Sequence, residues 1–253
     1  MTKYDAPALD KGLDILEFLS SQSIPQSQLE IATGINRKPN EIYRMLINLE
    51  KRAYIVKDPA SGKFSLTLRL FHLAHHHSPV DIMVKASEMH MQNLAYNINQ
   101  SVHLAVLHHN KLMIIAQVQS QTPVSLSVEI GSLFPLARTI SGKITLAHLK
   151  EEKRKQILAL CDDYQAMKAL EKKELLQELE TIKEHTCVRN KSMLTEGITD
   201  FAAPIFNMHQ EVIAVLAVST LTSQMRKLVT AEEIEKEILK TVHKIRESLG
   251  IIK

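Results

Sequence analysis

Cationic and amide side chains gather at the start of a predicted helix that begins at Pro39. Arg37 and Lys38 precede the helix, and Asn40 and Arg44 lie within it. An asparagine side chain can form paired hydrogen bonds with adenine in the major groove of DNA, whereas a cation without such pairing binds phosphate. We therefore predict that this helix enters a DNA groove, and we expect Arg44 to bind phosphate and not a base edge. The full set of predicted DNA contacts is Ser27, Arg37, Lys38, Asn40, Glu41, Arg44, Asn48, Lys51, Lys57 and Lys63.

An apolar stripe must hold this helix against the rest of a small domain. Ile42, Met45, Leu46 and Leu49 follow the i, i+3, i+4, i+7 spacing of one helical face. The residues opposite this stripe, which include Asn40, then face outward.

Neighbouring signals complete a winged helix-turn-helix. The pattern Ser27-x-x-Glu30 is a capping box that starts a preceding helix, and Gly34 supplies the turn after it. Two short β-like runs, 54–57 and 63–66, flank a turn at 58–62 and carry a lysine on each side of it. A small helical protein-interaction domain with scattered lysines is the alternative interpretation.

The remaining patterns predict an α+β protein with three parts. Leu9, Leu13, Leu16 and Leu19 form a stripe on a first helix, roughly 7–21. We expect the winged helix-turn-helix at 1–66, a linker helix at 67–79, and an antiparallel α/β sensor domain at 80–253. A helix from about 80 to 98 should open the sensor domain and one at 230–249 should close it. The strands predicted between them are 102–107, 112–118, 124–128, 198–206 and 212–219.

Composition favours a cytoplasmic protein without a membrane span. The chain has 253 residues, 45% of them hydrophobic, so it can bury a full core, and its net charge is only +3. Two isolated cysteines, Cys161 and Cys187, provide neither a disulfide framework nor a zinc site. No apolar run approaches the length of a transmembrane helix.

Two other classes of function remain as alternatives. His72, His75 and His76 have helical spacing and could bind a metal, which would make the chain a metal-responsive regulator. A redox enzyme would need a reactive thiol with a partner, and Cys161 and Cys187 have neither a Cys-x-x-Cys motif nor an adjacent base. We expect no catalytic activity, no cofactor and no resident metal.

The order of several motifs resembles the IclR family of bacterial transcription regulators. The motifs are Lys11-Gly12-Leu13-Asp14-Ile15-Leu16, the winged helix, 102–107, Leu126-x-x-x-x-Gly131-Ser132-x-x-Pro135, Gly142-Lys143, Gly197 with Ala202-Ala203-Pro204-Ile205, and 214–219. The resemblance implies a C-terminal GAF-like domain that binds a small effector, such as an organic acid, an aromatic acid or a sugar derivative. It also implies a homodimer, or a dimer of dimers, on a palindromic operator in double-stranded DNA.

The resemblance also implies which positions line the effector pocket. They are Leu126, Phe134, Ile140, Ser141, Asn190, Ile198, Asp200, Ala217 and Ser219. The chain departs from the family pattern at Asn190, where an acidic residue is common, at Asp200, where cysteine or a neutral residue is common, and at Ala217, where serine is frequent. An inward Asp200 would repel a carboxylate and favour a hydroxyl or amine donor. Alternatively, the apolar positions are ordinary core and Asp200 pairs with Arg138.

Overall fold

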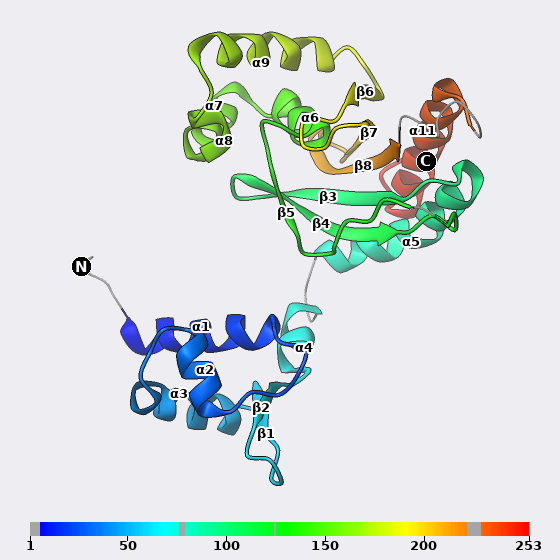
Figure 1. The fold of residues 1–253 in the computed structure, drawn as a ribbon. Helices are drawn as coiled ribbons and strands as arrows, with labels where there is room; N and C mark the ends of the chain where they lie inside the picture. The colour runs from blue at the N-terminus through cyan, green and yellow to red at the C-terminus, as the bar shows by residue number, and fades with distance from the viewer. Residues whose placement is uncertain (1–5, 76–78, 124, 222–228, 253) are drawn as a thin grey trace. The chain divides into compact units, whose positions relative to one another are not determined.

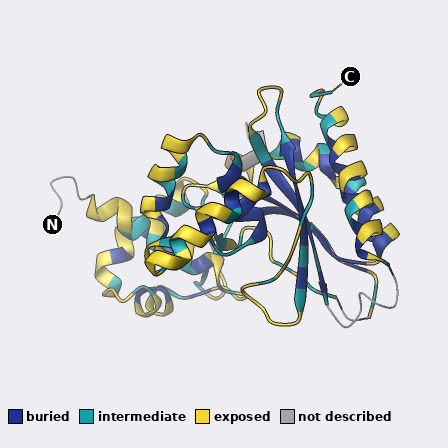
Figure 2. Ribbon diagram, turned by 90° about the horizontal axis from the view of Figure 1, so that it is seen from above, coloured by how far each residue is buried: buried dark blue, intermediate teal, exposed yellow. Residues whose placement is uncertain are grey.

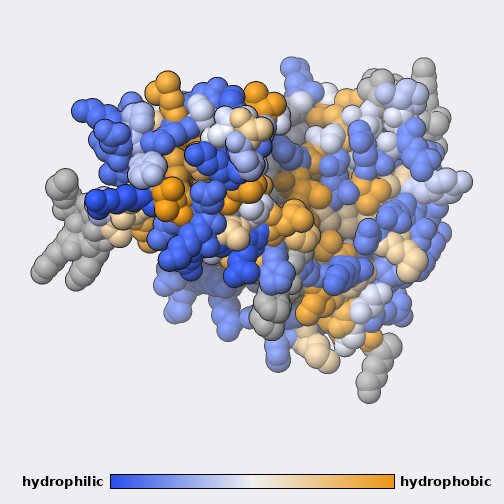
Figure 3. All heavy atoms as spheres, turned by 90° about the horizontal axis from the view of Figure 1, so that it is seen from below, coloured by the Kyte–Doolittle hydropathy of each residue, from blue (hydrophilic) through white to orange (hydrophobic). Residues whose placement is uncertain are grey.

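Contacts divide the chain into two units, Met1–Ser78 and Pro79–Lys253, called here the N-terminal and the C-terminal unit. The computed structural model describes residues 6–75, 79–123, 125–221 and 229–252 (Figure 1). Among the helices of these residues, none is long and apolar enough to cross a membrane. Hydrophilic side chains cover much of the face shown in Figure 3, with hydrophobic patches between them.

The N-terminal unit combines helices with a two-stranded wing. Its elements are α1 (Pro7–Ser20), α2 (Gln28–Gly34), α3 (Pro39–Lys51), β1 (Ile55–Lys57), β2 (Phe64–Leu66) and α4 (Arg69–His75). The strands pair antiparallel, with Lys57 opposite Phe64. The predicted winged helix-turn-helix is therefore present. The segment expected as a linker helix, 67–79, contains α4 and the first residue of the next helix.

The core of the N-terminal unit confirms the stripe predicted on α3. Ile42 and Leu46 are buried, and Met45 and Leu49 pack against the same cluster. This packing leaves the opposite side of α3 free to face solvent.

The stripe predicted on α1 is partly wrong. Leu9 is 61% exposed and Leu13 is 47% exposed, whereas Ile15 and Leu19 are buried. The i, i+4 pair of Ile15 and Leu19 faces the core, so the side of α1 that carries Leu9 and Leu13 is turned away from it.

The C-terminal unit is an antiparallel sheet with helices on both faces. The strands are β3 (Val102–His108), β4 (Lys111–Val118), β5 (Leu133–Pro135), β6 (Val188–Lys191), β7 (Ile198–Phe206) and β8 (Val212–Leu221). Their order across the sheet is β5-β4-β3-β8-β7-β6. The helices are α5 (Pro79–Ile98), α6 (Ile140–His148), α7 (Glu151–Leu160), α8 (Asp162–Gln165), α9 (Ala169–Ile182) and α11 (Ala231–Ser248).

Strand alternation sends apolar side chains to two separate cores. Phe201 and Leu216 belong to the cluster that contains residues of α5 and α11. Ala202 and Ala217, their neighbours in sequence, belong to the cluster of α6 and α9. Figure 2 shows buried residues along the strands and on the inner sides of the helices. The sheet is therefore covered on both faces.

Helix α6 is unusual because every residue from Ile140 to Ala147 is buried. Its approach to the preceding segment requires glycine at position 142. A Cβ atom there would lie 2.0 Å from the carbonyl oxygen of Leu136. The backbone amide of Ala137 also donates a hydrogen bond to Asp163 (2.7 Å), which ties this segment to α8. The start of α6 is thereby fixed against the sheet.

One predicted strand is absent, and two observed strands, β5 and β6, were not predicted. In the described part of 124–128, residues 125–128 belong to no strand. Strand β5 follows instead, and its Phe134 pairs with Leu112 of β4. The second unpredicted strand is β6, an edge strand that pairs with β7. The range predicted for β7, 198–206, is confirmed.

Candidate functional site

Helix α3 presents most of the predicted DNA contacts to solvent. Pro39 stands in its first turn, and Gln28 of α2 donates a hydrogen bond from Nε2 to the carbonyl of Pro39 (2.9 Å). This bond fixes α2 against the start of α3. The predicted contact residues that are exposed on or just before α3 are Arg37, Lys38, Asn40, Glu41, Arg44, Asn48 and Lys51.

Two of these residues pair with α1. Arg37 lies 3.6 Å from the carboxylate of Asp14, and Lys11 lies 3.7 Å from that of Glu41. Exposed ion pairs of this kind contribute about 0–1 kcal/mol. Arg37 can therefore leave Asp14 and bind a phosphate at a small cost in free energy. Glu41 is an acidic residue, so it adds no positive charge that would attract DNA.

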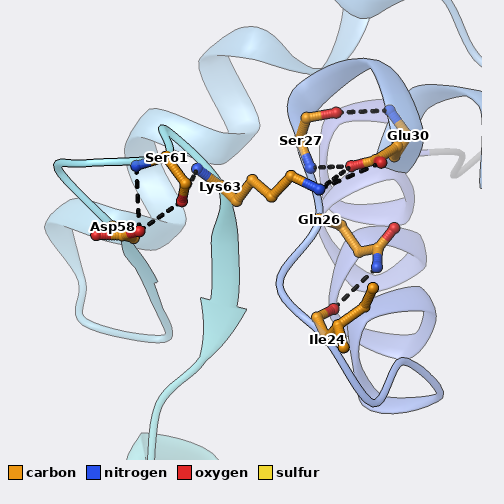
Figure 4. A network of polar contacts seen from close by, with 7 residues as sticks. All are labelled: Ile24, Gln26, Ser27, Glu30, Asp58, Ser61 and Lys63. Atoms are coloured by element: carbon orange, nitrogen blue, oxygen red, sulfur yellow. Dashed lines mark hydrogen bonds and ion pairs between the residues drawn. The ribbon is translucent and has the colours of Figure 1, made fainter.

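Ser27 and Lys63 lie in one polar network, shown in Figure 4. The amide of Ser27 donates to the carboxylate of Glu30 (2.6 Å), and the amide of Glu30 donates to the hydroxyl of Ser27 (3.3 Å). Lys63 of the wing lies 3.3 Å from the same carboxylate. The hydrogen bonds from Ser27, chiefly from its backbone, lower the pKa of Glu30. The predicted capping box is confirmed, and Lys63 joins the wing to the start of α2.

The wing turn is closed by Asp58. Its carboxylate accepts a hydrogen bond from the amide of Ser61 at 3.1 Å (Figure 4). It also accepts one from the amide of Ala60, at 3.1 Å. Gly62 adopts a φ of 70°, which glycine tolerates without strain. Lys57 is exposed before the turn, so a cation stands on each side of the tip, as the sequence predicts.

Two exposed side chains on α3 were not among the predicted contacts. Tyr43 is 54% exposed and Ile47 is 46% exposed. Apolar side chains in the major groove can contact the methyl group of thymine. The sequence could have indicated these two residues as DNA contacts, because they lie on the otherwise polar side of an amphipathic helix.

The C-terminal unit contains a cavity of about 450 Å³ between the sheet and the start of α6. Eight of the nine predicted pocket residues lie around it: Leu126, Phe134, Ile140, Ser141, Ile198, Asp200, Ala217 and Ser219. The lining residues that were not predicted are His103, Ala105, Leu112, Ile114, Ser127, Val128, Glu129, Ser132, Thr139, Ser192, Leu194 and Thr195. Small-molecule sites commonly occupy about 300–1,000 Å³, so the cavity can hold a small metabolite.

Asn190 is the predicted pocket residue that does not line the cavity. It stands opposite Asp200 in the pairing of β6 with β7, and therefore on the same face of the sheet. Its side chain lies one strand closer to the edge and donates a hydrogen bond to Glu178 of α9 (3.4 Å). Glu178 also binds the buried ammonium group of Lys143 (2.7 Å). Asn190 thus belongs to the contact between α6, α9 and the sheet edge.

Asp200 is the acidic group inside the cavity. The hydroxyl of Ser219 donates a hydrogen bond to Oδ1 (2.6 Å), and the side chain of Ser192 also bonds to the carboxyl group. Burial raises the pKa of Asp200, and these two hydrogen bonds oppose that rise. The partners of Asp200 are therefore hydroxyl groups, and no ion pair with Arg138 occurs in the described structure.

His103 on β3 also faces the cavity. It lies opposite Ala217 of β8, and both residues line the cavity. Burial lowers the pKa of His103 to about 4, so the imidazole is neutral at pH 7. The sequence could have indicated this role, because His103 stands two residues before Ala105 and so on the same side of a predicted strand.

The start of α6 forms one wall of the cavity. Thr139 caps the helix, because its hydroxyl accepts a hydrogen bond from the amide of Gly142 (3.2 Å). Ser141 is buried in the first turn. The first turn thus supplies both apolar and hydroxyl groups to the cavity wall.

The cysteines do not favour the redox-enzyme alternative. Burial raises the pKa of Cys161 to about 11 and that of Cys187 to about 12. Both thiols are therefore protonated at neutral pH, and a protonated thiol is a poor nucleophile.

The metal hypothesis falls largely outside the described residues. His76 and the side chain of His75 are not described. Within the described ranges, no group of three or more His, Cys, Asp or Glu residues could hold a metal ion.

Comparison with known families gives two matches along the chain. The family described as the IclR helix-turn-helix domain matches residues 8–59. The family described as the bacterial transcriptional regulator IclR C-terminal domain matches residues 75–247.

Individual proteins show the same similarity. The HTH-type transcriptional regulator KdgR of Dickeya chrysanthemi is 25% identical over 192 residues, which are 75% of this chain and 63% of that protein, less than two thirds of its length. The HTH-type transcriptional repressor AllR of Escherichia coli K12 is 23% identical over 252 residues, 97% of this chain and 91% of that protein. Among solved structures, an IclR homolog from Microbacterium hydrocarbonoxydans complexed with 4-hydroxybenzoate has a TM-score of 0.80 and 19% identity, covering 96% of this chain and 99% of that one.

Proposed function

Because the chain belongs to the IclR family of bacterial transcriptional regulators, we propose that it binds a palindromic operator as a homodimer and that a small metabolite controls this binding. The observation that carries the proposal is a cavity of about 450 Å³ in a unit distinct from the one with the exposed helix α3. A regulator needs such a division, because the effector must bind without blocking DNA.

In the proposed complex, α3 enters the major groove and the wing lies against phosphate. Asn40 reads a base edge, and Arg44, Lys51 and Lys57 bind phosphates. Tyr43 joins Asn40 on the base side. One helix contacts too little DNA for high affinity, so two copies read two half-sites.

The effector acts through the segment that joins the units. We assign 1–66 to DNA binding, 67–79 to the linker and 80–253 to the effector domain. A metabolite in the cavity changes the arrangement of the two effector domains, and the linker moves the α3 helices into or out of half-site register. The relative named as a repressor favours repression as the outcome.

Selection of binding sites from genomic DNA tests the DNA-binding part. Fragmented DNA from the source organism is captured by the purified protein at physiological salt and sequenced. We expect enrichment of a palindrome beside a small number of operons. Enrichment no greater than for a variant with Asn40→Ala and Arg44→Ala would contradict it.

The affinity for the selected operator is then measured with and without a metabolite extract of the same cells. A change in affinity supports the effector part of the proposal. An unchanged affinity at saturating extract would contradict ligand control while leaving DNA binding intact.

A further inference from the structure

The cavity lining is acidic and contains no cationic side chain among the described residues. Asp200 lies inside, Glu129 is exposed at the rim, and neither lysine nor arginine lines the cavity. The buried Lys143 of α6 is already paired with Glu178, through bonds of 2.7 and 2.9 Å. A ligand carboxylate would therefore find no cationic side chain to pair with among the described residues.

The carboxyl group of Asp200 is held in place by hydroxyl groups and has no cationic partner among the described residues. Ser219 donates a hydrogen bond to it at 2.6 Å, and Ser192 bonds to it as well. Hydroxyl donors orient a carboxylate, yet they carry no net charge. A partly buried carboxylate without a cation is costly, and a ligand that brings a cation removes that cost.

His103 does not supply the missing charge. Its imidazole is neutral at pH 7 because burial disfavours the protonated form, with the pKa lowered to about 4. It can donate or accept one hydrogen bond to a ligand, but it does not attract an anion.

The other residues that line the cavity determine what kind of ligand can fill the rest of it. Leu112, Ile114, Leu126, Ile140 and Ile198 form apolar walls. Phe134 is the one phenyl ring among the described lining residues, and aromatic rings attract cations through their π faces. The cavity thus matches a compact apolar molecule with one charged end.

We propose that the cavity binds a small molecule with an apolar body and a protonated amine that pairs with Asp200. This inference rests on the proposed role of the cavity as the effector site. It disfavours simple carboxylic acids as effectors, because they would bring a second negative charge beside Asp200.

Charge fractionation of the metabolite extract tests this class. At pH 7 the extract is separated into a fraction retained by a cation exchanger, a fraction retained by an anion exchanger, and an unretained fraction. Each fraction is then assayed for its effect on the affinity for the selected operator. We expect the effect in the cation-exchange fraction alone.

The Asp200→Asn variant links the effect to the cavity. Its response to the cation-exchange fraction should need at least about tenfold more material, because a buried charge partner is lost. The Glu184→Gln variant removes an exposed carboxylate that does not line the cavity and should respond within about threefold of the wild type, as expected for exposed charges. Affinity of both variants for operator in buffer alone serves as the folding control.

The outcomes separate this inference from the proposed function. An effect confined to the anion-exchange or unretained fraction overturns the amine assignment and leaves ligand control standing. An unchanged response of Asp200→Asn to the cation-exchange fraction also overturns it, because the amine would then bind elsewhere. If no fraction acts, ligand control itself fails, and the amine assignment fails with it.

Discussion

Asn40 and Arg44 lie one turn apart on the exposed side of α3, yet they offer different chemistry to DNA. An amide group can pair with adenine, and we expect the guanidinium of Arg44 to bind phosphate. In the proposed complex, Asn40 would recognise sequence and Arg44 would hold the DNA backbone.

Replacing each of them should give distinct signatures. Arg44→Ala should weaken binding to selected and shuffled DNA alike and reduce the slope of log affinity against log salt by about one. Asn40→Ala should cost about 1–3 kcal/mol on the selected operator only and relax base preference at one position in each half-site. Fluorescence anisotropy across a KCl series measures both effects. Equal loss for Asn40→Ala on both DNAs would remove Asn40 as a reader.

His103 should make stability depend on pH. Its pKa is near 4 in the folded protein and about 6.5 in the unfolded chain, so between these values the unfolded chain binds more protons. The stabilising contribution is complete above about pH 6.5 and is lost as the pH falls toward 4. We expect the wild type to lose on the order of 1–2 kcal/mol more than His103→Gln between pH 7 and pH 4.5.

Urea denaturation of both proteins at several pH values measures this difference. Titration of the carboxyl groups cancels in the comparison, because only position 103 changes. Parallel pH profiles for the two proteins would show that His103 is not held neutral in the fold.

At the scale of elements, Gly142 controls how closely α6 approaches the segment before it. The Gly142→Ala variant should lower the free energy of unfolding of the C-terminal unit by about 1–3 kcal/mol, because the added methyl group meets backbone at Leu136. It should also weaken the response to effector, since α6 begins at the cavity wall. Denaturant unfolding measures the first effect.

Gly12→Ala is the matched control. A Cβ atom at position 12 meets no atom within 4 Å, and alanine favours helix more than glycine does. This variant should be neutral or slightly stabilised. A Gly142→Ala protein as stable as Gly12→Ala would mean that the backbone around Leu136 shifts freely.

The sequence predicts a helix or strand best where burial alone determines its pattern of apolar residues. Strand β7 was located because its apolar run packs on both faces of the sheet. Strand β6 was missed because an exposed edge strand, Val188–Lys191, has no hydrophobic alternation to detect.

The segment 125–128 shows how alternation can mislead. Leu126 and Val128 turn apolar side chains to the cavity, while Ser125 and Ser127 accept hydrogen bonds from Gln119 and Gln117, and Ser127 also borders the cavity. The alternation of apolar and polar residues in this segment therefore arises because one side borders the cavity and the other makes polar contacts. A segment can show this pattern without pairing as a β-strand. The sequence could not show that Asn190 lies outside the cavity. Asn190 is on the expected face of the sheet, but its hydrogen-bond partner, Glu178, comes from a helix distant in the sequence.

At the scale of the whole molecule, DNA and effector should influence each other equally. If the effector changes operator affinity by some factor, operator DNA must change effector affinity by the same factor, because the two binding equilibria are linked. Titrating the active metabolite into the protein, with and without saturating operator, measures the second factor by calorimetry. If the change in operator affinity and the change in effector affinity differ by more than the experimental error, the metabolite does not act by binding to this protein.

The complete burial of α6 also constrains how this protein can vary. Most helices have a solvent side on which substitutions accumulate harmlessly, and α11 has exposed positions of this kind between its buried ones. Residues Ile140–Ala147 have none. Genetic screens of this segment would therefore find intolerant positions in an unbroken run, without the three-to-four-residue rhythm of an ordinary helix, and polar replacements there would be lost from any population selected for regulation.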